Sequence, residues 1–151
     1  MRCVDVNVLV CAHRPESPDH GIVQQWIERA RRGPEPLAIA GIVASGFLRI
    51  VTNTRIFKDP TPLDRALESL DALYDSPAVL PLVPGERHWG LFTELRTSVR
   101  ATGNLVPDCY LAALAIEHGA TWVTTDRGFA RFPGLRLETP RPRRDPTLGT
   151  G

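Results

Sequence analysis

Three aspartates, Asp5, Asp108 and Asp126, are the residues whose positions most clearly suggest chemistry. Asp5 and Asp126 each follow a short apolar run, and Asp108 stands in the first turn of a predicted helix, where the helix dipole favours a carboxylate. Carboxylates that are brought together repel one another, and a divalent cation relieves the repulsion. Oxygen ligands of this kind suit Mg²⁺ or Mn²⁺, and Mg²⁺ usually keeps several waters and accepts a phosphate oxygen.

The elements that would position these aspartates alternate between strands and helices. The predicted strands cover residues 2–6, 37–39, 79–82, 121–124 and 132–137. The predicted helices cover residues 20–30, 42–51, 63–74, 86–100 and 107–118, and residues 7–12 continue the first strand into a turn or short helix. Such an alternation predicts an α/β domain, a three-layer sandwich with a mostly parallel central sheet, with Pro81 on an edge strand. Sites in such sheets form beyond the carboxyl ends of strands, where Asp5 and Asp126 are expected.

Length and composition narrow the class of protein further. A chain of 151 residues with 42% hydrophobic residues fits one folded domain. No apolar run approaches the roughly 20 residues of a membrane span, and the N-terminus meets Asp5 too soon for a signal peptide, so we expect a cytoplasmic protein. Three cysteines, Cys3, Cys11 and Cys109, lack metal-ligand spacing and are expected to be reduced thiols rather than zinc ligands.

The charge is nearly balanced, at +1 overall. The segment 139–151 holds three arginines and one aspartate, a local charge of +2, which leaves the body of the chain at −1. This balance argues against broad, charge-driven binding of nucleic acid. The same segment holds three prolines and a single large hydrophobic residue, so we expect a domain at 1–138 followed by a disordered Pro/Arg-rich tail at 139–151.

Four motifs in order resemble one known family. Asp5-Val6-Asn7-Val8-Leu9 is similar to the opening motif of the PIN domain, and Pro107-Asp108-Cys109-Tyr110-Leu111-Ala112-Ala113-Leu114-Ala115 to its third acidic motif. Thr124-Thr125-Asp126-Arg127-Gly128-Phe129 is similar to the fourth. With Phe47-Leu48-Arg49-Ile50-Val51-Thr52-Asn53 they resemble the VapC toxins, over nearly the whole chain to about residue 138. Each motif alone is weak, but four in order make the family resemblance strong.

The resemblance implies an activity, a metal and partners. It implies a PIN-like fold and hydrolysis of RNA phosphodiester bonds with Mg²⁺ or Mn²⁺ held by Asp5, Asp108 and Asp126, directly or through water. It also implies a homodimer and a small VapB-like antitoxin, which we expect to cover helices near Trp26 and Phe47. No membrane partner is implied.

Several polar residues keep two interpretations each. Asn7 could orient Asp5 or fix a turn, and Thr124 could bond a ligand carboxylate or merely end a strand; both are taken as candidate catalytic residues. Three arginines could hold RNA phosphates or be ordinary surface residues: Arg49, Arg127 and Arg131. Two histidines are expected to be surface or core residues rather than catalysts: His13 and His88.

Gly46 departs from the family pattern. Many members carry an acidic residue, usually glutamate, just before the Phe-Leu-Arg stretch, and Gly46 stands there. A glycine inside a helix costs roughly 1 kcal/mol against alanine, so either close helix packing or a lost acid is needed to explain it. Neither Glu94 nor Glu117 is an obvious replacement. We therefore expect weakened cleavage; the alternative is a catalytically dead domain that only binds antitoxin or RNA.

A phosphoryl-transfer domain is a further alternative. A receiver domain needs an acidic pair near its first strand and a late lysine, but Lys58 is the only lysine. A haloacid-dehalogenase type of domain needs Asp-x-Asp, where this chain has Asp5-Val6-Asn7. Both departures favour the nuclease interpretation.

Overall fold

The computed structural model describes residues 1–141 and contains one five-stranded sheet in which every pairing is parallel. The order of the strands is β3-β2-β1-β4-β5. Their bounds are β1 Arg2–Val4, β2 Leu37–Ala40, β3 Val79–Leu82, β4 Thr121–Val123 and β5 Arg136–Glu138. The sheet confirms the predicted α/β class, and β3 with Pro81 lies at an edge, where a missing N–H is tolerated.

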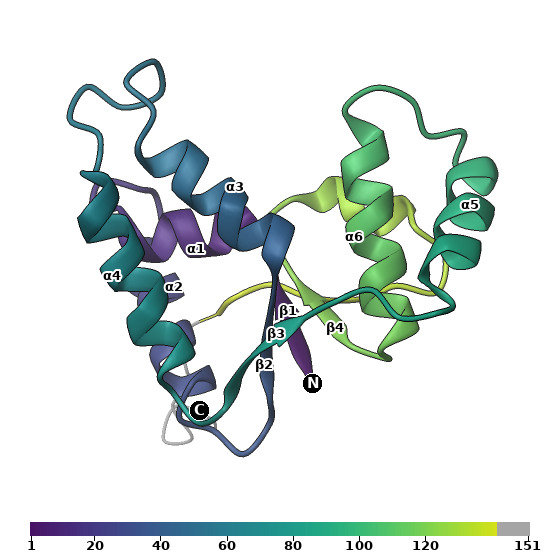
Figure 1. The fold of residues 1–151 in the computed structure, drawn as a ribbon, viewed down its shortest axis with the longest axis horizontal. Helices are drawn as coiled ribbons and strands as arrows, with labels where there is room; N and C mark the ends of the chain where they lie inside the picture. The colour runs from purple at the N-terminus through teal and green to yellow at the C-terminus, as the bar shows by residue number, and fades with distance from the viewer. Residues whose placement is uncertain (142–151) are drawn as a thin grey trace, which may run out of the picture.

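In the described part of the chain, six α-helices form the two outer layers of this sandwich. Their bounds are α1 Val6–His13, α2 His20–Ala30, α3 Gly41–Val51, α4 Leu63–Tyr74, α5 His88–Ser98 and α6 Leu105–Glu117. Figure 1 shows the sheet nearly edge-on, with α1 to α4 on one face and α5 and α6 on the other. This arrangement follows from the topology, because the chain reverses direction across the sheet between β3 and β4. None of the helices in residues 1–141 is long and apolar enough to cross a bilayer.

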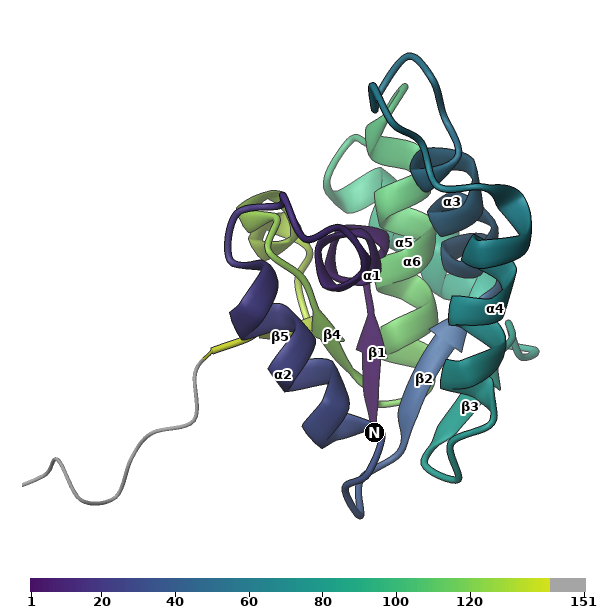
Figure 2. The ribbon, with the colours of Figure 1, turned by 90° about the vertical axis from the view of Figure 1, so that its left-hand side faces the viewer.

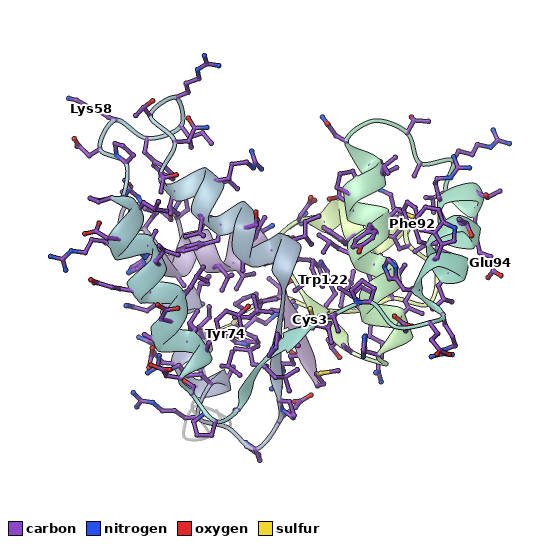
Figure 3. All side chains as sticks on the ribbon, viewed as in Figure 1. Cys3, Lys58, Tyr74, Phe92, Glu94 and Trp122 are labelled. Carbon is purple, nitrogen blue, oxygen red and sulfur yellow. The ribbon has the colours of Figure 1, made fainter. Side chains whose placement is uncertain are left out.

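The core lies on both faces of the central strands. Every residue of β2 is buried, and the inner parts of β1 and β4 are buried too, as expected for strands covered by helices on both sides. Trp122 and Cys3 lie at the centre of the molecule in Figure 3 and are fully buried. Cys3 and Cys109 are buried free cysteines, and Cys11 is a partly buried one.

Several boundaries differ from the predicted ones, and one short helix was not predicted. The first strand ends at Val4, because the Asp5 side chain caps α1. The short helix Arg127–Arg131, η1, was not predicted, and the last strand therefore begins only at Arg136. Helix α6 begins two residues before Pro107, which is possible because the first four N–H groups of a helix need no intrahelical partner.

The predicted tail is described only in part. Pro140 is buried, and the carbonyl of Arg141 accepts a hydrogen bond from Arg29 at 3.2 Å. The rest of the predicted tail, 142–151, lies outside the described residues. Figure 2 shows the sheet face-on, with its strands side by side and α1 seen end-on above the carboxyl end of β1.

Candidate active site

Asp5 lies at the junction of β1 and α1. Its backbone N–H donates to the carbonyl of Val123, which ties the residue to the end of β4. Its carboxylate accepts the backbone N–H of Val6 at 2.7 Å and so caps α1. The side chain is only 4% exposed. A buried carboxylate at the carboxyl edge of a parallel sheet fits the site predicted there.

Thr124 connects two of the three aspartates. Its hydroxyl donates to Asp5 at 2.6 Å and accepts the backbone N–H of Asp126 at 3.0 Å. The same hydroxyl accepts the side-chain amide of Asn7 at 3.2 Å. Thr124 therefore bonds the carboxylate of Asp5, one of the three predicted metal ligands. Asn7 does not bond Asp5 directly and acts on it only through Thr124.

Asp108 faces the same edge from the other layer of helices. It lies in the first turn of α6, as predicted, and is partly buried. Burial raises its pKa, the charge of Asp126 raises it further, and the charge of Arg131 lowers it. Burial likewise raises the pKa of Asp5, against the hydrogen bonds from Thr124 and Val6, and the charges of Asp108 and Asp126 add to the rise. The three carboxylates therefore lie within electrostatic range of one another.

Asp126 is held by a tight turn. It precedes η1, and its carboxylate accepts the backbone N–H of Gly128 at 2.7 Å. A β-carbon at position 128 would lie 3.0 Å from an oxygen of that carboxylate, so a glycine at this position leaves room for the Asp126 side chain. The sequence interpretation missed this turn, although the order Asp126-Arg127-Gly128 is typical of an aspartate that bonds its own backbone two residues on.

The three aspartates fit a partly hydrated cation. Within residues 1–141, no three acidic, histidine or cysteine side chains converge closely enough to enclose an ion as they stand. Mg²⁺ is usually bound through one or two carboxylates, with water completing its shell, so direct contact with all three is not required. The donor atoms are hard oxygens, which suit Mg²⁺ or Mn²⁺ rather than zinc.

Position 46 faces the same region. Gly46 lies in the middle of α3, and a β-carbon there would meet only a methyl group of Val6, at 3.4 Å, an ordinary contact. Val6 follows Asp5 and begins α1. A side chain at position 46 would therefore leave α3 toward the first turn of α1, where Asp5 lies. Close packing at the β-carbon does not by itself require a glycine there.

The other acidic and histidine candidates lie elsewhere. Glu94 is exposed on α5 and projects outward, away from the sheet (Figure 3). Glu117, at the far end of α6, accepts the backbone N–H groups of Gly85 and Arg87. His13 bonds Thr61 and Ser69 at the far end of α1, and the buried His88 bonds the carbonyl of Tyr110 between α5 and α6. None of these four residues replaces a carboxylate at position 46.

The raised pKa values predict how stability depends on pH. Folding makes Asp5 and Asp108 bind protons more tightly, so above the ordinary pKa of 3.8 the folded state holds more protons than the unfolded one. The free energy of unfolding that these groups contribute therefore falls as the pH rises through the raised pKa values. We expect the melting temperature of metal-free protein to fall less steeply above pH 4 in Asp108→Asn than in the wild type.

The variant must be compared with the wild type because other carboxylates change the pH dependence of stability in the opposite direction. A hydrogen bond from the N-terminal ammonium group, for example, lowers the pKa of Glu35. Glu94→Gln, which removes an exposed carboxylate on α5, is the matched control and should follow the wild type. If the melting temperatures of the wild type and Asp108→Asn change with pH in parallel, the electrostatic interactions described for the site are contradicted.

Comparisons with known proteins agree with this fold. The family model of the PIN domain matches residues 2–135. Ribonuclease VapC43 from Mycobacterium tuberculosis is 48% identical over 140 residues, which cover 93% of this chain and 95% of the relative. Two solved structures resemble this chain in fold. VapBC2 from Rickettsia felis, bound to a DNA fragment from its promoter, has a TM-score of 0.65 at 22% identity and covers 91% of this chain and 97% of its own.

The second structure is VapC20 from Mycobacterium tuberculosis, described as a sarcin-ricin loop cleaving toxin, with a TM-score of 0.63 at 14% identity. It covers 90% of this chain and 99% of its own. At such low sequence identities, the two structures support the assignment of the fold alone. The family model spans residues 2–135, which include Asp5, Asp108 and Asp126, and the 48% identical relative matches over 140 residues. The chain therefore belongs to the PIN-domain family and, within it, to the VapC ribonucleases.

Proposed function

We propose that this protein is the toxin of a toxin–antitoxin pair and an endoribonuclease that requires Mg²⁺ or Mn²⁺. One observation carries the proposal. Asp5 and Asp126 are joined through the hydroxyl of Thr124 at the carboxyl edge of the sheet, and Asp108 faces them from α6. A cation would relieve the repulsion between these carboxylates, and a phosphodiester is a substrate that such a cation would attract.

Each residue has a definite task in this proposal. A bound cation would polarise a non-bridging phosphate oxygen and lower the pKa of the attacking water. Asp5, Asp108 and Asp126 would hold it directly or through water. Thr124 fixes the orientation of the Asp5 carboxylate, and Asn7 fixes Thr124. Because Gly46 supplies no carboxylate, we expect slower water activation than a fourth acid would allow.

Cleavage of RNA tests the proposal. Purified protein should cut at least one member of a panel of structured RNAs, including a sarcin-ricin hairpin, at discrete positions when Mn²⁺ or Mg²⁺ is present. EDTA should stop the reaction. Cleavage that persists in EDTA, or that is equally fast in an Asp126→Asn variant, would contradict the proposal.

An antitoxin has a groove available to it. An open pocket of about 310 Å³ lies between α1, α2 and α4, and its lining includes Phe47, Leu70 and Leu73. Trp26 itself does not line this groove, since the residue is only 7% exposed and its N–H donates to Glu138 at 3.0 Å, but its helix α2 contributes Ile27 to the lining. We propose that the antitoxin lays an apolar segment there and brings an arginine to the carboxylates.

A pair of neighbouring substitutions tests this contact. Leu73→Glu places a charge in the groove and should weaken copurification of the antitoxin encoded beside the gene by at least about tenfold, because an unpaired charge would be buried. Ala72→Glu, exposed on the adjacent position of α4, should leave the complex unchanged. Equal recovery of antitoxin with both variants would remove the groove from the interface.

We also expect a homodimer, as in the family. Light scattering of purified protein should give about twice the chain mass of 16.7 kDa. The exposed apolar residues on the described surface include Ile42 on α3 and Trp89 on α5, which are 50% and 68% exposed. A monomer at micromolar concentration would contradict this prediction.

A further inference from the structure

The turn after Asp126 holds a second charged group beside its carboxylate. Within η1 the Nε of Arg131 donates to the carbonyl of Gly128 at 2.8 Å. A β-carbon on Gly128 would approach both the Asp126 carboxylate, at 3.0 Å, and the Nη2 of Arg131, at 3.4 Å. The carboxylate and the guanidinium therefore lie off the same side of Gly128, and the absence of a side chain at Gly128 leaves room for both.

Arg131 is close to the acidic site without being paired to it. Its charge acts on Asp108, so the guanidinium lies within electrostatic range of a second carboxylate. In the described part of the chain, no carboxylate oxygen lies within 4.0 Å of it. The bond to Gly128 uses one of its five N–H groups, which leaves four for an anion. Arg2 and Arg14, in contrast, are engaged with glutamates.

We propose that Arg131 is a phosphate-binding residue of the RNA site, with its free N–H groups on the non-bridging oxygens of a substrate phosphodiester. This inference rests on the proposed ribonuclease function and names a residue that contacts the substrate. Three carboxylates on one edge repel a polyanion, and a fixed guanidinium beside them offsets that repulsion where the phosphate must arrive. The planar fork of arginine matches two phosphate oxygens, which the ammonium group of lysine does not.

The turn itself prepares the guanidinium for this task. The hydrogen bond to Gly128 fixes the guanidinium before RNA arrives, so less side-chain entropy is lost on binding. The same glycine donates to Asp126. One turn therefore places an anionic group and a cationic group side by side, the first suited to a cation and the second to the phosphate that accompanies it.

RNA binding without metal tests the assignment apart from catalysis. The probe is a fluorescein-labelled RNA hairpin with a single-stranded loop, followed by anisotropy in EDTA over a range of salt concentrations. Arg131→Gln should bind about 10- to 100-fold more weakly than the wild type. The slope of log affinity against log salt should become shallower by about 0.7, as expected for one lost contact to a single strand. Arg131→Lys should be intermediate, because it keeps the charge and loses the fork.

Arg32→Gln is the matched control. Arg32 lies between α2 and β2, at the amino ends of the strands, and pairs with Glu28. Its loss should therefore leave the salt dependence of RNA binding unchanged. Melting temperatures distinguish RNA binding by Arg131 from a purely structural role. If Arg131 only stabilised the turn, both Arg131 variants would melt earlier than the wild type, and the folded variants would keep the RNA affinity of the wild type. That result, or wild-type affinity in Arg131→Gln, overturns the assignment and leaves the ribonuclease proposal standing. A wild type that neither binds nor cuts RNA overturns both.

Discussion

Replacing Asp5 or Asp108 by asparagine is expected to lower the rate of RNA cleavage by about 10²-fold or more, because each change removes a negative oxygen from the proposed cation site. The two variants should differ in stability. Asp108 is partly buried beside Asp126, so asparagine there removes a repulsion and should leave metal-free stability level or higher. In Asp5→Asn the new amide would have to face the Thr124 hydroxyl, which already accepts two N–H groups, so this variant is expected to melt earlier.

Thr124→Val separates holding a cation from positioning its ligands. It keeps all three carboxylates and removes the hydroxyl that orients Asp5, so cleavage should fall by about 10- to 100-fold and partly recover at high Mn²⁺. Glu94→Gln serves as the control, with an exposed carboxylate far from the site, and should cleave like the wild type. Full activity in Asp108→Asn would contradict the proposed site.

Gly46→Glu is expected to raise cleavage by about 10²–10⁴-fold, since this is the usual contribution of a positioned base. The reason is geometric: a side chain at position 46 leaves α3 toward the start of α1, and its β-carbon meets only a Val6 methyl at an ordinary distance. Loss of a helical glycine should also add up to roughly 1 kcal/mol of stability. The variant should be more toxic to its host when it is expressed without antitoxin.

Gly46→Gln is the matched control for this change. It has the same shape as the glutamate variant, so it should gain the stability and none of the activity. If Gly46→Glu melts earlier and cleaves no faster, the glycine is needed for packing, and position 46 cannot accommodate the acidic residue that the family usually has there. The site of three aspartates would remain under that result.

Much of the fold could be predicted because the local signals and the tertiary structure agree. The amphipathic segment 63–74 became α4 with the predicted bounds, and the apolar run at 37–39 became the fully buried β2. The positions of Asp5 and Asp126 directly after predicted strands predicted that they would meet, because parallel strands present their carboxyl ends at one edge. The structure brings Asp5 and Asp126 together through Thr124 at that edge, with Asp108 within electrostatic range.

What could not be predicted depends on contacts between distant residues. The bond from Asn7 to Thr124 joins residues 117 positions apart, and no local pattern shows that Asn7 reaches a hydroxyl rather than Asp5 itself. The η1 turn was missed because five residues are too few for a helical period to appear. Trp26 lies on the apolar face of an amphipathic helix, and no local pattern shows that Glu138 of the last strand accepts its N–H.

The most direct test of the account is the binding of Mn²⁺ to metal-free protein, measured by calorimetry on the wild type, Asp5→Asn, Asp108→Asn, Asp126→Asn and Glu94→Gln. If the three aspartates form the cation site, the wild type and Glu94→Gln should bind Mn²⁺ alike. Each of the three aspartate variants should bind it at least about tenfold more weakly while remaining folded at the temperature of the measurement. Equal Mn²⁺ binding by all five proteins would contradict the account, because the cation would then be held elsewhere.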